Sequence, residues 1–293
     1  MGIAAYALWG LFPLYWPLLE PGGAVEILGH RIVWSAVVML LLVFAVRRGA
    51  HLRATLRNRR TATLLVVAAA VITVNWCVYI WGVNNEHVVE TSLGYFINPL
   101  VTVVMGVLIL GERLRGIQWV AVGVAGLACL VLTADYGRLP WVALALAFSF
   151  GTYGLLKKTA GAGAVESLTI ETLVLAPIAL SYLLWLGSTG DGDFTGHGVD
   201  HMVLLASAGI VTAVPLICFG GAAIRIPMTT LGLLQYIAPV LQFAIGVLVR
   251  GEDMSGARWV GFGLVWLALA VFTVESVTHH RRNLVLSAEA VAA

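Results

Sequence analysis

Charged residues are scarce in this chain. Only 11% of its 293 residues are Asp, Glu, Lys or Arg, and 60% are hydrophobic. A soluble domain carries about 25% charged residues, so this composition excludes a water-soluble fold and makes lipid the expected solvent. Cysteine is scarce as well, and Cys77, Cys129 and Cys218 all fall in apolar runs without a pairing or metal-binding motif. We therefore expect packing cysteines, no metal site and no cofactor.

A small net charge and a missing nucleotide motif exclude two further classes. The formal net charge of +2 is too small to indicate a nucleic-acid partner. The glycines never form GxxxxGK[ST], so ATP is not expected to be the energy source within this chain. No clustered acid, base or nucleophile marks a catalytic site, and we expect no enzyme.

What the sequence does contain is a series of long apolar runs. About 20 residues of helix cross the roughly 30 Å hydrocarbon core. Backbone groups in lipid must be paired internally, and unbroken runs favour helices over the short alternating segments of a barrel. The predicted spans are Gly2–Leu19, Ile27–Val46, Ala62–Val83, Val88–Leu110, Gly116–Ala134, Leu139–Thr159, Ser167–Gly187, Met202–Ile224, Ile226–Val249 and Gly256–Val274. The sequence thus predicts an all-α integral membrane protein with ten transmembrane helices.

The ends of the chain and its basic residues indicate an orientation. The first run has no positive segment before it, so we interpret it as a span and not as a removed signal peptide. Even-numbered connections and the tail carry most of the basic residues: Arg47, Arg48, Arg53, Arg57, Arg59, Arg60, Arg113, Arg115, Lys157, Lys158, Arg225, Arg281 and Arg282. Only Arg31, which opens the second span, and Arg138, Arg250 and Arg258 are left for the other face, whose longest connection, Ser188–His201, has no Lys or Arg. The positive-inside rule then predicts that both termini are cytoplasmic.

The chain also contains an internal repeat. Ile97-Asn98-Pro99 recurs 140 residues later as Ile237-Ala238-Pro239, and the register continues without a gap to Thr133 and Thr273. We expect residues 1–135 and 136–276 to be two five-helix repeats, followed by a cytoplasmic tail at 277–293. Because five is odd, the repeats would be inverted in the membrane, as in many secondary transporters that bind substrate near the midplane.

Several strings resemble a known family. Ser92–Leu100, SLGYFINPL, followed by Gly111–Leu114, GERL, resembles the fourth-helix signature of RarD permeases, which belong to the EamA-type permeases of the drug/metabolite transporter superfamily. Trp9–Trp16, Glu26–Ser35 and Gly232–Pro239 are similar to that family's first, second and ninth helices. The resemblance covers nearly the whole chain. It implies a ten-helix permease of the bacterial cytoplasmic membrane, in a superfamily that exports amino acids, drugs and other metabolites, and it names no substrate.

Two prolines mark the best candidate for a binding site. Pro99 and Pro239 lie inside the fourth and ninth predicted spans, where each removes a backbone donor and is expected to kink its helix. Interrupted helices at matching positions of two halves point to a transport site, although a packing kink would give the same pattern. Polar side chains gather around these kinks: Tyr95, Asn98, Gln235, Tyr236 and Gln242. A substrate or interhelical hydrogen bonds would satisfy them.

Other spans add further cavity candidates. Asn75 and Tyr79 are four residues apart and so share one helix face, and Pro215 lies in register with Asn75 in the second repeat. Helix packing explains these residues equally well. On the first span, Trp9 is a cavity candidate. Tyr15, Trp16 and Trp185 lie near predicted membrane faces, where an aromatic belt is the favoured interpretation.

Ionisable groups in or near spans are expensive and so are functional candidates. For proton coupling these are His30, Glu90 and Glu171, although their depth near a water interface favours structural roles. Three explanations fit Lys157: it attracts an anionic solute, it stabilises a helix C-terminus, or it lies on the cytoplasmic side as the positive-inside rule requires. Glu112 and Glu252 occupy equivalent turns beside glycines, which suggests helix capping or hinges.

The sequence therefore predicts a secondary active transporter. Its partners would be a small-molecule substrate and the lipid bilayer. We expect export of small amphipathic metabolites, amino acids or drugs by alternating access around a midplane cavity. The alternatives are a non-transporting membrane sensor or structural subunit, and a polytopic lipid-modifying enzyme. Many Gly and Ala residues are compatible with a monomer or a homodimer.

Overall fold

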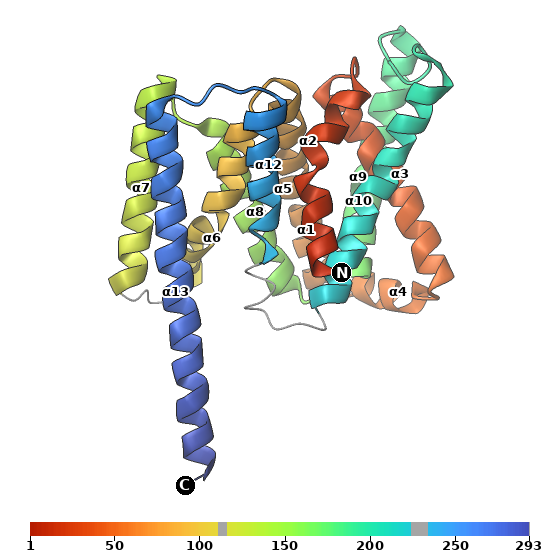
Figure 1. The fold of residues 1–293 in the computed structure, drawn as a ribbon. Coiled ribbons are helices and arrows are strands. Elements are labelled where there is room, and N and C mark those ends of the chain that lie inside the picture. The colour runs from red at the N-terminus through yellow and green to blue at the C-terminus, as the bar shows by residue number, and fades with distance from the viewer. Residues whose placement is uncertain (111–115, 224–233, 293) are drawn as a thin grey trace.

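The computed structural model describes residues 1–110, 116–223 and 234–292. The described residues form an all-helical membrane protein (Figure 1). Its helices are α1 (Gly2–Gly10), α2 (Phe12–Tyr15), η1 (Trp16–Leu19), α3 (Ala24–Ala45), α4 (Gly49–Arg57), α5 (Arg59–Asn84), α6 (Val88–Leu110), α7 (Gly116–Tyr136), α8 (Trp141–Ala160), α9 (Ala164–Thr189), α10 (Gly198–Ala223), α12 (Ile237–Ala244), η2 (Ile245–Val249) and α13 (Gly256–Ala292).

Six helices of the described chain are long and apolar enough to cross a membrane: α3, α5, α7, α9, α10 and α13. A seventh span results if α1 and the α2–η1 segment are counted together, because they are bent by 42° at Leu11. Proline at the second position of α2 fits this bend, since the first turn of a helix tolerates a missing N–H. The helices α8 and α12–η2 are apolar but shorter.

Two features differ from the expected pattern of spans and connections. The arginine-rich second connection contains a helix of its own, α4, none of whose residues is buried. The last helix does not end near Val274 but continues to Ala292. The predicted Gly111-Glu112 turn and the start of the ninth span, residues 226–233, lie outside the described residues.

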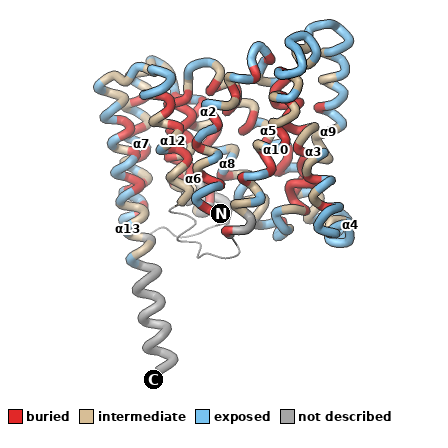
Figure 2. The backbone as a smooth tube through the Cα atoms, turned by 45° about the vertical axis from the view of Figure 1, so that its right-hand side comes forward, coloured by how far each residue is buried: buried red, intermediate tan, exposed pale blue. Residues whose placement is uncertain are grey.

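The buried side chains form two main apolar cores (Figure 2). The first joins η1, α3, α5, α9 and α10, with Ile27, Ile80 and Leu205 among its fully buried residues. The second joins α6, α7 and α13, with Leu93 and Phe262 at its centre. The helix α8 contributes to both cores, because its successive faces turn to opposite sides. Consequently α8 connects two packed bundles.

The closest helix pairs join the two predicted halves of the sequence. The helix α7 packs on α13, α6 on α8, α3 on α9 and α10, and α5 on α8 and α9. In the same way α1 packs on α10 and α12. Each of these pairs has one member that begins before residue 136 and one that begins after it. The halves are therefore interleaved and do not form two separate bodies.

The prolines and one glycine occupy different environments. The helix α6 continues through Pro99, and α10 through Pro215. Pro239 is the third residue of α12, so it stands in a first turn, where its missing N–H leaves no helical hydrogen bond unmade.

At Gly94 on α6, an added Cβ would lie 2.8 Å from the carbonyl oxygen of Ala143 on α8. Glycine there permits the close approach of α6 and α8.

Candidate functional site

A polar cluster joins α5, α6 and α8. Asn75 is buried, and its amide donates to the carbonyl of Leu146 at 3.0 Å and to Ser149 Oγ at 2.9 Å. The Tyr95 hydroxyl donates to Asn75 Oδ1 at 3.4 Å. The rings of Tyr79 and Tyr95 meet edge to face at 5.7 Å. Three predicted cavity residues are thus brought together, and part of their polarity is used in helix packing.

A buried arginine lies beside this cluster. Arg31 is the eighth residue of α3, about 10 Å along the helix axis from Ala24, and only 4% of its surface is exposed. Its Nε donates to Thr212 Oγ1 on α10 at 3.0 Å. Within the described residues Nη1 has no hydrogen-bond partner. Arg31 was not among the predicted site residues, because its position at the start of the second span predicted a place at the water interface.

Aromatic rings surround the Arg31 guanidinium. Its central carbon lies 4.1 Å from the ring centre of Trp76, 4.9 Å from that of Trp16 and 5.9 Å from that of Phe12. The placement of Trp16 in an interfacial belt is therefore wrong, because it is fully buried. The 3₁₀ turn that follows Tyr15 directs Trp16 inward. Trp185, at 58% exposed, remains compatible with the belt.

Tyr15 is also tied to the protein. Its hydroxyl donates to the carbonyl of Leu204 at 2.9 Å and lies 2.8 Å from Ser207 Oγ, both on α10. These bonds attach the end of the first span to α10. A role in helix packing therefore replaces the expected belt position.

Trp9 and Gln242 meet between α1 and α12. Gln242 is buried, and its amide nitrogen donates to the backbone carbonyl of Trp9 at 3.2 Å, close to the bend of the first span. The Gln242 oxygen and Asn98 Oδ1 are both buried without a hydrogen-bond partner among the described residues. Buried polar atoms of native proteins are normally paired. Asn98 and Gln242 thus have unused acceptors on helices of both halves.

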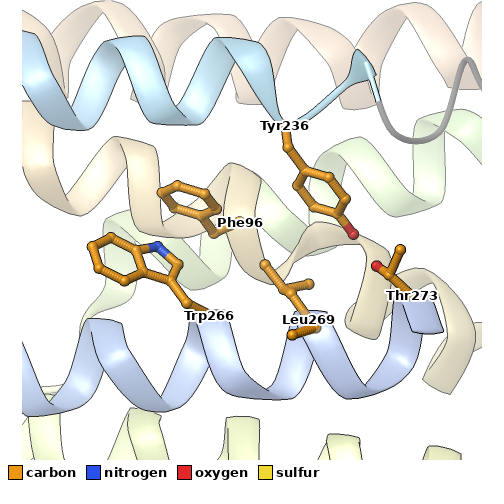
Figure 3. A pocket seen from close by; sticks show the side chains of 6 residues that line it. Phe96, Tyr236, Trp266, Leu269 and Thr273 are labelled. Carbon is orange, nitrogen blue, oxygen red and sulfur yellow. The ribbon is translucent and has the colours of Figure 1, made fainter. Parts of the chain in front are cut away.

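Tyr236 lies apart from that group. It lines a pocket of about 260 Å³ together with Phe96, Trp266, Leu269, Ala270 and Thr273 (Figure 3). The Tyr236 hydroxyl points toward Thr273 and also interacts with Gln235. Mostly apolar side chains from α6 and α13 form the remaining walls. Tyr236 therefore belongs to a separate pocket between α6 and α13, and Gln235 contacts its hydroxyl but is not among the residues that line this pocket.

The proton-coupling candidate Glu90 is fully paired. Its carboxylate accepts two hydrogen bonds from Arg138, at 3.2 and 2.8 Å, and one from the backbone N–H of Val142 at 3.1 Å. The pairing raises the pKa of the Arg138 guanidinium. Glu90 thus joins the first turn of α6 to the first turn of α8.

Glu171 and His30 occupy different environments. Glu171 is fully buried on α9 and accepts hydrogen bonds from Lys157 at 2.6 Å, Tyr153 at 2.9 Å and Ser167 at 3.1 Å. His30 stacks on Phe194, with ring centres 4.7 Å apart. In the described part of the chain, Glu90, Glu171 and His30 share no hydrogen-bond partner. The structure therefore does not bring the three coupling candidates together.

Glu252 caps a helix, which is one of the two roles predicted for it. Its carboxylate accepts hydrogen bonds from the backbone N–H groups of Val88, at 2.5 Å, and Val89, at 2.9 Å. These are orphan donors at the start of α6. Burial raises the pKa of Glu252, and the two amide hydrogen bonds oppose this shift. Its repeat counterpart Glu112 lies outside the described residues.

His87 precedes α6 in the same region. Its ring lies 5.3 Å from that of Trp81. Burial lowers the pKa of the imidazole, and the nearby Glu90 carboxylate opposes this shift. The connection between α5 and α6 is therefore a packed polar corner and contains no pre-formed catalytic arrangement in the described residues.

Comparisons with known proteins agree with this architecture. The family model described as the EamA-like transporter family matches residues 1–134. The chain is 58% identical to Protein RarD of Streptomyces exfoliatus, over 96% of this chain and 90% of the relative. It is 41% identical to Protein RarD of Escherichia coli K12, over 97% and 96%. It is 31% identical to the Chloramphenicol-sensitive protein RarD of Pseudomonas aeruginosa, over 92% and 91%.

A solved structure shares the fold. One crystal structure of a protein has a TM-score of 0.61 and 19% identity, over 93% of this chain and 96% of that chain. Together, the helical architecture and the EamA-like match define a multi-pass membrane transporter and not an enzyme. The chain belongs to the RarD family.

Proposed function

We propose that this transporter is a secondary active exporter of small amphipathic metabolites, amino acids or drugs. The carrying observation is the set of buried polar atoms without partners on helices of both halves, at Tyr79, Asn98 and Gln242. Such atoms are costly in a protein interior unless a ligand or water pairs with them. A relative that is named chloramphenicol-sensitive fits an amphipathic solute. We place the substrate near the midplane, between α5, α6 and α12.

We further propose ten spans arranged as two inverted five-helix repeats. Helices α3 and α9 begin 140 residues apart, at Ala24 and Ala164, and so do α7 and α13, at Gly116 and Gly256. The packing is mirrored as well: α3 with α10 matches α9 with α5, and α6 with α8 matches α12 with α1. An inverted pair of repeats supports alternating access around a shared site.

For orientation, we propose that both termini are cytoplasmic, in the bacterial cytoplasmic membrane. The N-terminus, the end of α13 and the arginine-rich α4 lie toward the same end of the molecule, at the bottom of Figure 1. The connection between α9 and α10, which has no Lys or Arg, lies at the opposite end. The positive-inside rule places the arginine-rich end in the cytoplasm.

For proton coupling, we propose Glu171 ahead of Glu90 and His30. Glu171 is fully buried, and its ion pair with Lys157 joins α8 to α9. Protonation of the carboxylate would release Lys157 and loosen that contact. The variant Glu171→Gln is then expected to retain substrate exchange but to lose accumulation driven by a pH gradient. Loss of both activities in a folded variant would assign Glu171 to binding or structure.

The test of export is uptake into inside-out proteoliposomes under an imposed pH gradient, screened over amino acids, organic acids and amphenicol drugs. We expect saturable flux of at least one solute. The same solute should raise the unfolding temperature of the purified protein, because it binds the folded state. Asn98→Ala and Gln242→Ala should abolish the stabilisation, and the exposed control Ser188→Ala should retain it. Absence of both flux and stabilisation would favour a non-transporting sensor or structural subunit.

A further inference from the structure

The surroundings of Arg31 lack a counter-charge. A guanidinium stays protonated at all accessible pH values, so Arg31 carries a full positive charge. Yet the ion pairs among the described residues join other groups, and none includes Arg31. Its side chain is 4% exposed, so bulk water does not solvate it. Buried charges are normally paired, and an unpaired one is expensive in a membrane.

The aromatic rings partly stabilise this buried positive charge. The faces of Trp76 and Trp16 attract the cation through their quadrupoles. Thr212 supplies one hydrogen-bond acceptor, to Nε alone. Neither contribution carries negative charge. The rings therefore hold the guanidinium in place and leave its charge available.

The polar atoms around Arg31 include N–H and O–H groups that can donate hydrogen bonds to a ligand. Arg31 Nη1 and Trp16 Nε1 are buried N–H donors without a partner in the described chain. The Tyr79 hydroxyl is also buried without a partner, and it lies within electrostatic range of Arg31. Tyr95, also within that range, donates its own proton to Asn75. A ligand that complements these groups must accept hydrogen bonds and carry negative charge.

We propose that Arg31 is the binding residue for the carboxylate of an amphipathic organic anion. The proposal rests on the transport function proposed above and narrows its substrate class. The planar guanidinium fork matches a carboxylate, and the rings of Trp76 and Phe12 offer a surface for its apolar body. Thr212 fixes the orientation of the fork through Nε.

The same geometry selects among anions. A phosphate dianion would need a second cation, and the charged interactions of Arg31 involve tyrosines alone: Tyr15, Tyr79 and Tyr95. A zwitterionic amino acid would need a carboxylate for its ammonium group, and no carboxylate interacts with Arg31 in the described chain. Aromatic or acyl carboxylates with a single negative charge therefore fit better than free amino acids.

The experiment uses the full chain in lipid nanodiscs and three matched probes: 3-phenylpropionate, its neutral amide, and phenylalanine. Trp16 and Trp76 flank Arg31, so binding should change the intrinsic tryptophan fluorescence. We expect a saturable change and thermal stabilisation with 3-phenylpropionate, and at least tenfold weaker responses to the amide and to phenylalanine. Equal responses to the acid and the amide overturn the proposal, as does no response to the acid.

Substitutions test the assignment to Arg31. We expect Arg31→Gln to abolish the response to the acid, and Arg31→Lys to weaken it about tenfold, because lysine keeps the charge and loses the fork. The control Arg53→Gln removes an exposed arginine of α4 and should change nothing. If Arg31→Gln does not fold, Thr212→Val and Tyr79→Phe each remove one polar contact and should still weaken acid binding. Unchanged affinity in folded variants overturns the proposal.

Flux measurements separate this proposal from the transport proposal. Export of a neutral drug that does not depend on Arg31, without selective binding of the acid, supports transport and overturns the anion site. Selective, Arg31-dependent binding of the acid without flux of any solute supports the anion site and overturns the transport proposal. Arg31-dependent flux of the acid supports both.

Discussion

Replacement of Glu252 by alanine should destabilise the protein by about 2 kcal/mol. The Glu252 carboxylate accepts hydrogen bonds from the N–H groups of Val88 and Val89, which alanine would leave without partners at the start of α6. Loss of a capping side chain costs about 0.5–2 kcal/mol, and a hydrogen bond to a charged group contributes about 1.5–3 kcal/mol. Because Glu252 is partly buried, we expect a value near the top of the capping range. This corresponds to about a 30-fold change in the folding equilibrium.

The assay is unfolding of the purified protein by SDS, followed by circular dichroism. Asp253→Ala is the matched control, since it removes an exposed carboxylate one residue further along the same connection. Glu252→Gln keeps an acceptor and should cost less than Glu252→Ala. Equal unfolding midpoints for Glu252→Ala and Asp253→Ala would refute the capping argument.

Three further outcomes are expected in the same unfolding assay. Glu171→Leu leaves Lys157 without its buried partner and should lower the free energy of unfolding by about 3 kcal/mol. Adding Lys157→Leu should recover part of this loss, and no recovery would contradict the stabilising role of the ion pair. Gly94→Ala places a methyl group against the α8 backbone and should lower the free energy of unfolding by about 1–3 kcal/mol. At Gly123 an added methyl group meets open space, so Gly123→Ala should be neutral or slightly stabilising. Similar effects of the two substitutions would contradict the close approach of α6 and α8. Burial lowers the pKa of His87 in the folded state, so the stability that depends on its neutral form is present above the ordinary value of 6.5 and is lost as pH falls below it. The wild type should therefore lose more stability on acidification than His87→Asn, and parallel pH profiles would contradict this.

The length of the apolar runs was sufficient to find most of the helices, because lipid demands long apolar segments with internally paired backbones. The start of α6 at Val88 and of α7 at Gly116 agrees with the predicted spans. Composition did not reveal α4, whose helix lies outside the apolar runs. It also did not reveal that α13 continues to Ala292, because a polar helical extension carries no hydropathy signal.

Side-chain environments were harder to predict than helices. Arg31 was placed at a water interface because a charged residue early in a span usually lies there. In the structure α3 begins at Ala24, three residues before the predicted span, which puts Arg31 deeper. One available signal was the concentration of Trp and Tyr in the first and third spans, because aromatic faces stabilise a buried guanidinium. The pairing of Asn75 with α8 depended on tertiary contacts that no local pattern encodes.

The interleaving of the halves has a consequence for biosynthesis. When a ribosome has completed the first 135 residues, α3 and α7 have been made, but α10 and α13, on which they pack, have not. The early helices must therefore wait in the membrane with their packing faces covered by lipid or by the insertion machinery. Completion of the second core depends on α13, the last helix to leave the ribosome. The two predicted halves therefore depend on each other to fold.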